Sequence, residues 1–477
     1  MKTSVVERKQ SKPLLTKVIS VTELSLNIVG LDTLATTARY STNGVFINMY
    51  LTPEEKLAYE FANQWRDKNY HPDLSNINWT RFAKLLTHNR MAMLAAPILE
   101  RSQVEIPFAA QKLINEQAEK YKRSASKLGT ALVTYLNAAS TRQIPTIILK
   151  GLWLCEKIYH NSAMRPGGDI DILVPKNKVD ACMALLKEQG IGEFWPNLLK
   201  DEYFTKHHLH QQRSTPDLSI WFEIHWAFDH PYTLLTVNYE SIFERAKSEQ
   251  LLGATIQEMS IPDLLLSLAI HLVKHAVYLP SLIERADLPR IILADGMLMY
   301  YLDIAEVIRQ HKEIDWDLTV QLARDWGAVD ILGSVLRVCK QYFGAPVPDE
   351  VLSALPVSEP WPVTRKFMAR AVEQELASYE ERPASRFWQF VLASNGAFIL
   401  RPVRLLETIS YFFPPKDFLY RRYGKATIGV KVYHLAKAFL QTLSFVWDTF
   451  SFGMERYFRL KRMGKKTSLF NTLETDL

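Results

Sequence analysis

The alternation in residues 169–174 constrains the fold of this chain more than any other feature of its sequence. Acids alternate with isoleucine in the order Asp-Ile-Asp-Ile, and a leucine and a valine follow. Side chains two residues apart on a β-strand point to the same face, so this period of two predicts a strand. The carboxylates of Asp169 and Asp171 should therefore share one face of a sheet.

Two carboxylates on one face predict a metal site. Paired carboxylates repel each other and raise each other's pKa unless a cation lies between them. Mg²⁺ is a hard cation that accepts several oxygen ligands and keeps waters that substrate phosphates can replace. The alternative for Asp169 and Asp171 is a solvated edge strand with alternating acids, and the Asp-x-Asp pattern alone leaves both open.

The composition is typical of a soluble globular protein with several domains. The chain has 477 residues, of which 48% are hydrophobic and 23% charged, and this excludes a mainly disordered, collagen-like or coiled-coil protein. Its three cysteines lie far apart in the sequence and suit a reducing compartment. We expect no signal peptide and no membrane-spanning helix, because charged or strongly polar residues interrupt every long apolar window.

Two further segments predict strands of the same sheet. Residues 146–149 form a β-branched run that suits a buried strand. Residues 218–226 alternate, which places Glu223 and His225 on one face and Phe222 with its apolar neighbours on the other. The expected sheet therefore carries a third acid, from a distant part of the sequence.

A glycine separates the first predicted strand from a helix expected at residues 152–159. Lys150 and Gly151 stand at this junction, where the free N–H groups and positive dipole of a helix N-terminus could bind a phosphate. Arg165, four residues before Asp169, could add a guanidinium to the same phosphate. The alternative is that the glycine only makes a turn.

Helical patterns dominate on both sides of these strands, which predicts an α+β fold with a small mixed sheet. Thr52, followed by a proline and two acids, is typical of a helix start. Another helix is expected at residues 177–189 because Gly190 is a favoured terminator. The regions that we expect are an N-terminal arm or short strands at 1–52, helices at 53–143, the core at 144–260, a helical domain at 261–412 and a basic, aromatic, helical tail at 413–477.

Taken in order, these motifs resemble the uncharacterised bacterial nucleotidyltransferase family of the DNA polymerase β superfamily. The residues that carry the resemblance are Leu149-Lys150-Gly151, Tyr159, Arg165, Asp169-Ile170-Asp171 and Phe222-Glu223-Ile224-His225-Trp226. The resemblance implies a nucleotidyltransferase core. It also implies transfer of a nucleotidyl group from a nucleoside triphosphate with two Mg²⁺ ions, or with Mn²⁺ in their place.

The resemblance further implies roles for individual residues. The implied metal ligands are Asp169, Asp171 and Glu223. Glu223 could also help to deprotonate the acceptor hydroxyl. Gly151 would let the backbone approach the triphosphate, while Lys150 and Arg165 would offset its charge. The chain departs from the superfamily pattern at Leu152, where glycine or serine is usual, so a hydroxyl contact to phosphate is missing or comes from elsewhere.

Lys274 is a further candidate for contact with the triphosphate. It lies between His271 and His275 on a predicted helix, where the spacing of four would form a cationic strip on one face. The alternative is an ordinary surface or core role for all three residues. Asp303, on a helix expected at residues 300–309, is interpreted as a surface or capping acid rather than a catalytic one.

The basic charge of the chain is concentrated in residues 416–466. Twelve Lys or Arg face three acids in this segment, and aromatic residues are interleaved with them. This composition permits an interfacial helix on anionic lipid or an RNA-binding surface with stacking rings. The alternative is a pair of amphipathic helices that pack on the preceding domain with a basic outer face.

We therefore expect a metal-dependent nucleotidyltransferase that moves an NMP from an NTP to an acceptor hydroxyl or phosphate and releases pyrophosphate. The acceptor could be a small molecule, a protein side chain or an RNA end. One alternative is a glycosyltransferase, which also uses Asp-x-Asp but leaves Lys150, Gly151 and Glu223 unexplained. The other is an inactive protein of this fold that binds membrane or RNA through its tail. The resemblance and the cysteine usage indicate the bacterial cytoplasm, with peripheral contact at the inner membrane as an option.

Overall fold

A computed structural model describes residues 51–165, 167–192, 201–275, 283, 285–358 and 409–462. Side chains are described for fewer residues at the end of the last range. The arm or strands expected at 1–52 fall almost wholly outside the described residues. The same holds for residues 359–408 of the expected C-terminal helical domain and for the end of the tail.

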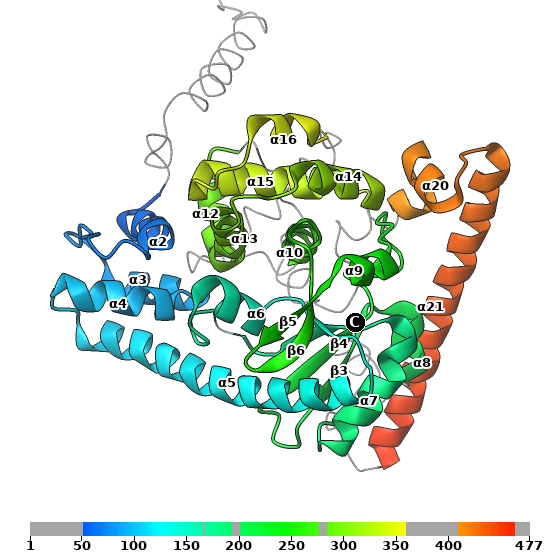
Figure 1. The fold of residues 1–477 in the computed structure, drawn as a ribbon, viewed down its shortest axis with the longest axis horizontal. Helices are drawn as coiled ribbons and strands as arrows, with labels where there is room; N and C mark the ends of the chain where they lie inside the picture. The colour runs from blue at the N-terminus through cyan, green and yellow to red at the C-terminus, as the bar shows by residue number, and fades with distance from the viewer. Residues whose placement is uncertain are drawn as a thin grey trace, which may run out of the picture. The chain divides into compact units, whose positions relative to one another are not determined.

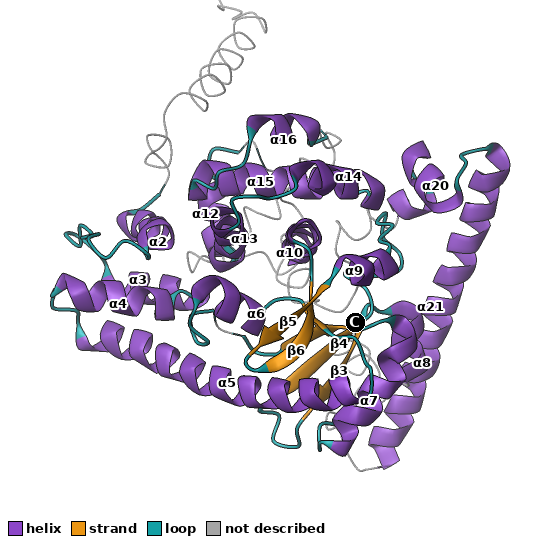
Figure 2. Ribbon diagram, in the orientation of Figure 1, coloured by secondary structure: helices purple, strands orange, loops and turns teal. Residues whose placement is uncertain are grey.

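A four-stranded mixed sheet forms the centre of the described chain, as the sequence predicts (Figures 1 and 2). The strand order is β1-β2-β4-β3, in which β2 and β4 are parallel and the two outer pairings are antiparallel. The strands are β1 (Ile147–Ile148), β2 (Ile170–Leu173), β3 (His210–Ser214) and β4 (Trp221–His225). The three predicted strands are thus confirmed, with shorter bounds, and Asp169 lies just before β2.

The apolar face of the sheet explains why β2 and β4 pair in this register. Ile170 lies opposite Phe222, and Ile172 lies opposite Ile224. All four side chains are almost fully buried. The ring of Tyr135, on α5 (Phe108–Thr141), packs against Phe222 with centroids 5.5 Å apart. This burial fixes the alternation, because a shift of one residue would move the apolar side chains to the other face.

Four helices precede the sheet in residues 51–146. They are α2 (Pro53–Gln64), α3 (Trp79–His88), α4 (Ala92–Ser102) and α5. The predicted helix start is confirmed: Thr52 accepts from the backbone N–H of Glu55, and the Glu55 carboxylate accepts from the N–H of Thr52, which makes a capping box. The Tyr59 hydroxyl donates to the Pro289 carbonyl at 2.9 Å, so this helix packs against the helical domain that follows the sheet.

Short helices connect the strands of the core. They are α6 (Leu152–Leu154), the π-helix η2 (Cys155–Tyr159), the 3₁₀-helix η3 (Lys176–Lys178), α7 (Val179–Glu188), α8 (Asp201–His207) and α9 (Tyr239–Arg245). The helices predicted at 152–159 and 177–189 are confirmed, although each changes its helix type part of the way along. Gly190 follows α7 with a positive φ of 77°, as expected of a helix terminator.

The sequence did not predict strand β3 or a separate β-hairpin. The hairpin consists of β5 (Lys247–Leu251) and β6 (Ala254–Glu258). Four of the five β5 residues are exposed, and β3 is His-Gln-Gln-Arg-Ser, so neither strand shows an alternation of apolar and polar residues. Backbone pairing with β6 and β4, rather than local hydrophobic patterning, determines these two strands.

Helices follow the sheet, as predicted, and the tail is helical too. The elements are α10 (Ile261–His275), α12 (Leu288–Ala294), α13 (Leu298–Gln310), α14 (Trp316–Trp326), α15 (Val329–Phe343), α16 (Asp349–Ala354), α20 (Lys416–Tyr423) and α21 (Ile428–Arg462). Within the part of the chain that the structure describes, none of the helices combines the length and the apolar character that crossing a membrane would need.

Candidate active site

The parallel pairing of β2 and β4 brings the three predicted carboxylates together. Asp171 is the register partner of Glu223, and Asp169 lies one residue before β2. Oxygen atoms of Asp169, Asp171 and Glu223 all lie within 4.8 Å of one another. Fifty-two positions separate Asp171 from Glu223 in the sequence, so only the sheet makes this cluster.

The glycine junction meets the carboxylate cluster at its edge. The Lys150 ammonium lies 3.0 Å from Oδ2 of Asp171. Gly151 has φ +58° and ψ −114° and caps α6. A side chain is strained at this φ, whatever space surrounds it. The backbone of Asp169 also passes close, because a Cβ added to Gly151 would lie 3.9 Å from the Asp169 carbonyl oxygen. The chain therefore needs glycine at this position to join the strand to the helix.

Two polar side chains hold the carboxylates from the side of the sheet. Nε2 of His225 lies 3.2 Å from Oδ1 of Asp171 and 3.3 Å from Oε2 of Glu223. The Gln212 amide, on β3, donates to Oε1 of Glu223 at 2.9 Å. Glu223 and His225 thus share one face of β4, as the alternation of residues 218–226 predicts. Both oxygens of Glu223 are held, and the carboxylate plane is fixed.

The electrostatics of the cluster lower the pKa of two carboxyl groups and raise the pKa of the third. Burial and the Asp171 carboxylate raise the pKa of Asp169 to about 6. Burial would also raise the pKa of Asp171, but the Lys150 ammonium and the hydrogen bond from His225 lower it to about 2. Burial opposes ionisation of Glu223 as well, and His225 together with Lys150 holds its pKa below the usual range. Burial would lower the pKa of His225, but its hydrogen bonds with Asp171 and Glu223 raise it. Lys150 and His225 therefore offset the charges of Asp171 and Glu223, whereas Asp169 has no ion pair with the described residues.

The donor set fits a hard divalent cation. Three carboxylates that converge without a cation for each of them are the ligands that Mg²⁺ prefers, and a cation would relieve the repulsion that raises the pKa of Asp169. A second group of side chains, His210, Glu223 and His225, also has ligand atoms within 4.8 Å of one another. Imidazole nitrogens suit transition metals such as zinc and iron better than Mg²⁺, whereas carboxylates suit both Mg²⁺ and Mn²⁺. The geometry thus agrees with the predicted metal chemistry.

Comparison with known protein families shows to which family the chain belongs. The family model of an uncharacterised nucleotidyltransferase matches residues 75–344, more than half of the sequence, and the match contains the whole sheet and the carboxylate cluster. The chain belongs to this nucleotidyltransferase family. No curated protein and no solved structure shows a significant match. The predicted family and fold class are thus confirmed, whereas the acceptor is not identified by any relative.

Lys274 lies near the carboxylate cluster. It is on α10, and the charges of Asp229, Glu223, Asp171 and Lys150 all act on it. Burial and the nearby Lys150 lower its pKa, although the acids oppose this shift. Its ammonium has no hydrogen bond or ion pair with the described residues, in contrast to the ammonium of Lys150, which is bound to Asp171.

The two histidines beside Lys274 do not form the cationic strip that their spacing suggested. Burial, together with the charges of Lys150 and Lys274, holds the pKa of His271 well below its usual value. The same causes, burial and then Lys274, lower the pKa of His275 to about 4. The two rings lie 4.8 Å apart, and both also lie near Tyr300. Both imidazoles are therefore neutral near pH 7, and Lys274 supplies the cation of this helix face.

Arg165 makes a contact that the sequence analysis did not anticipate. Its Nε donates to Oδ2 of Asp303 at 2.5 Å, and both side chains are buried. The Tyr159 hydroxyl donates to Oδ1 of the same carboxylate at 2.8 Å. Interpreting Asp303 as a surface or capping acid was wrong, because it joins the helical domain to the loop before Asp169. The contact of Arg165 with a triphosphate stays a prediction.

A group of histidines around Glu223 also escaped the sequence analysis. The rings of His208 and His210 lie 4.9 Å apart, and His208 and His230 lie 4.8 Å apart. His210 in turn lies 4.8 Å from His225. The available signal was the density of histidines at residues 207–210, but without β3 in the prediction nothing placed them beside the carboxylates.

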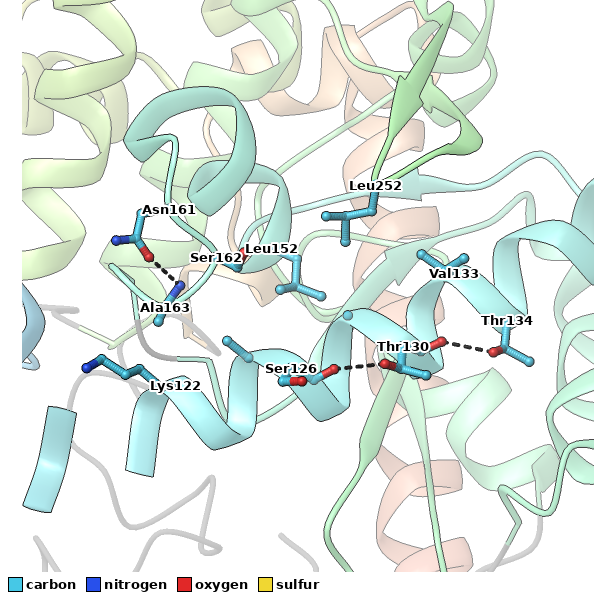
Figure 3. Close-up of a pocket in the computed structure, with 12 residues that line it drawn as sticks. Lys122, Ser126, Thr130, Val133, Thr134, Leu152, Asn161, Ser162, Ala163 and Leu252 are labelled. Carbon is cyan, nitrogen blue, oxygen red and sulfur yellow. Dashed lines mark hydrogen bonds between the residues drawn. The ribbon is translucent and has the colours of Figure 1, made fainter. Parts of the chain in front are cut away.

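A cavity of about 580 Å³ lies apart from the carboxylates (Figure 3). It is lined by one face of α5, by residues 161–163, by Leu152 and by Leu252 at the tip of the hairpin. The Thr130 and Thr134 hydroxyls, which point along α5, donate to helix carbonyls one turn earlier. None of the three carboxylates or of the four predicted phosphate-binding residues lines this cavity, so we assign it no role in the site.

Proposed function

We propose that this protein transfers an NMP from an NTP to an acceptor hydroxyl or phosphate, with release of pyrophosphate and with two Mg²⁺ ions. One observation carries the proposal. The register of β2 and β4 brings Asp169, Asp171 and Glu223 together beside the strand–helix junction that contains a lysine and a glycine. This cluster lies inside the segment that matches the nucleotidyltransferase family. Manganese could replace magnesium, because both metals accept carboxylate ligands of this kind.

The three carboxylates would hold the ions in this proposal. Bound there, the ions would stabilise charge on the attacking and leaving oxygens of an in-line displacement. Gln212 and His225 would fix the plane of the Glu223 carboxylate. Because its neighbours lower the pKa of Glu223, this carboxylate is a weak base, and we favour a ligand role over a role in deprotonating the acceptor.

The cationic side chains would have different roles in binding the triphosphate. Lys274 is the residue best placed to bind phosphate oxygens, since its ammonium is not paired with a described residue. Lys150 would exchange its contact with Asp171 for a phosphate once a metal neutralises that carboxylate. Gly151 would let phosphate oxygens approach the N–H groups at the start of α6. We propose Arg165 as a positioning residue, which holds the loop before Asp169 through Asp303.

Calorimetric titration with each of the four NTPs, with and without Mg²⁺, tests the proposal. We expect metal-dependent binding that the double variant Asp169→Asn/Asp171→Asn loses. Asp180→Asn is the matched control, because this exposed acid on α7 undergoes the same change outside the cluster.

Three outcomes would contradict the proposal. Binding that survives the double substitution would place the nucleotide elsewhere. A wild-type protein that binds no NTP with any divalent metal would favour the inactive, nucleotidyltransferase-fold binding protein. A sugar nucleotide that binds in preference to NTPs would favour a glycosyltransferase.

A further inference from the structure

One side of helix α21 packs against the rest of the protein. Val430 and Ala438 are buried in an apolar cluster there, and the Phe445 ring lies near other aromatic rings. Polar contacts accompany this packing: His434 Nε2 bonds the Tyr411 carbonyl at 2.6 Å, and the Gln441 carbonyl oxygen accepts from the Tyr411 hydroxyl at 2.9 Å. About two turns further on, Asp448 accepts from Lys206 and lies 2.7 Å from Nε2 of His207, both on α8. An ordinary surface helix buries its apolar face and exposes its polar one.

The opposite side of α21 exposes a continuous apolar stripe. Its members follow one another at spacings of three, four and seven, so they lie along one side of the helix. They are Ile428, Val432, Phe439, Leu443, Val446 and Phe450, and they are between 49% and 81% exposed. At 1.5 Å per residue the stripe is roughly 33 Å long. Apolar surface of this extent marks an interaction site.

A second row widens this apolar face. Tyr433, Leu440 and Trp447 recur every seven residues beside the stripe, and each is more than half exposed. Two adjacent rows make a broad arc rather than the narrow seam with which a coiled coil pairs its helices. A flat apolar medium can cover such an arc along its whole length.

Basic residues flank the apolar face, and acids are absent from its described part. Lys425 and Lys431 are exposed near its start, and Lys437 is half-buried in the next turns. The acid within this stretch, Asp448, is turned toward α8 and bound there. From residue 409 to residue 462 the sequence has ten basic and three acidic residues, a net charge of +7. This charge complements an anionic surface.

From these observations we infer that α21 lies in the surface of an anionic lipid bilayer, with its apolar stripe among the acyl chains. Aliphatic side chains favour lipid over RNA as the partner, since bases stack on aromatic rings but gain little from Ile428, Val432, Leu443 and Val446. Helices with an apolar face flanked by Lys and Arg bind anionic membranes in this way. The tail lies outside the segment that matches the family, so the inference stands whether or not the proposed transfer reaction is correct.

Vesicle flotation of the full chain tests the inference. We expect binding to vesicles of phosphatidylcholine with phosphatidylglycerol, and little binding to phosphatidylcholine alone. Phe439→Glu/Leu443→Glu should reduce the bound fraction at least tenfold. Lys425→Gln/Lys431→Gln should reduce the partition coefficient by about fivefold for each charge, as should high salt overall. Phe108→Glu, the same kind of change at an exposed phenylalanine of α5, should have no effect.

The same variants test whether the fold is retained and whether another partner covers the apolar face of α21. Circular dichroism and Mg²⁺-dependent NTP binding should be unchanged in Phe439→Glu/Leu443→Glu, which shows that the loss is one of surface and not of folding. Failure of the wild type to bind anionic vesicles overturns the inference. So does a wild-type dimer that this variant splits without any vesicle binding, which would assign the face to a second copy, or RNA binding that replaces vesicle binding.

Discussion

Two groups of buried carboxylates in this protein are built in opposite ways. On α13, Asp303 is bound by Arg165 and Tyr159, and Glu306 forms ion pairs with Arg66 and Arg309. On the sheet, three carboxylates share one lysine and one histidine. The carboxylates of the first group are all paired within the protein, whereas Asp169 of the second group has no ion pair with the described residues, and its pKa is raised to about 6. A buried acid of this kind is a candidate for cation binding, and this difference separates a structural acid from a candidate ligand.

The comparison predicts that charge at the sheet is needed for activity. Asp171→Asn should lower nucleotidyl transfer by about a thousandfold or more, because it removes a ligand that places charge at the reacting phosphate. The variant should keep the wild-type circular dichroism spectrum. Activity within tenfold of the wild type would break the distinction, and Asp180→Asn again serves as the control.

A substitution in the paired carboxylates of α13 should change the stability of the protein. Asp303→Ala leaves the Arg165 guanidinium buried without its carboxylate, and breaking a buried pair in this way costs roughly 3–5 kcal/mol of unfolding free energy. Urea denaturation measures the loss. Mg²⁺ binding by the fraction that remains folded should be weakened much less than by Asp171→Asn. A variant of unchanged stability would show that the pair is not structural.

Neutralising Asp169 in the carboxylate cluster of the sheet should instead increase the stability of the protein. The pKa of Asp169 is about 6 in the folded chain and 3.8 in its unperturbed state, so its ionised form destabilises the folded protein above pH 6. Asp169→Asn should therefore stabilise the metal-free protein by ~3 kcal/mol at pH 8, and the gain should vanish near pH 3, where the wild-type carboxyl is largely protonated in both states. Thermal denaturation in EDTA at the two pH values measures this difference, and destabilisation at pH 8 would contradict it.

The smallest effect is expected from a neighbour of the cluster. Gln212→Ala removes the hydrogen bond that fixes Oε1 of Glu223 but no carboxylate, so metal affinity should fall by about tenfold. Titration with Mn²⁺ followed by electron paramagnetic resonance measures the affinity. A loss as large as that of Asp171→Asn would place Gln212 among the ligands themselves.

The sequence was informative where side-chain chemistry and local pattern coincide. Asp169, Asp171 and Glu223 lie on segments whose alternation shows which side faces the core, so their convergence could be predicted before the sheet was known. Gly151 was predicted by its place between a strand and a helix, and its positive φ gives the physical reason. These features depend on a few neighbouring residues.

The rest depended on contacts between distant segments. Strand β3 is polar throughout and is recognisable only as the partner of β4, so Gln212 and His210 could not be placed near Glu223. Asp303 looked like a surface acid because its helix is amphipathic by sequence, yet the partner that buries it, Arg165, is 138 positions away. The neutral state of His271 and His275 likewise arises from burial and from Lys150, on another element.

The parallel register of β2 and β4 has a consequence for how the protein matures. Asp171 and Glu223 become neighbours only when two strands that are 52 positions apart have paired, and long-range parallel pairing is among the slower events in folding. Until then the carboxylates are separate acids with no special affinity for divalent ions. A chain emerging from the ribosome, or one truncated before β4, would hold the glycine junction and the Asp-x-Asp pair without chemistry. Catalytic competence and completion of the central sheet would thus arrive in a single step, so unfinished chains would consume no nucleotide.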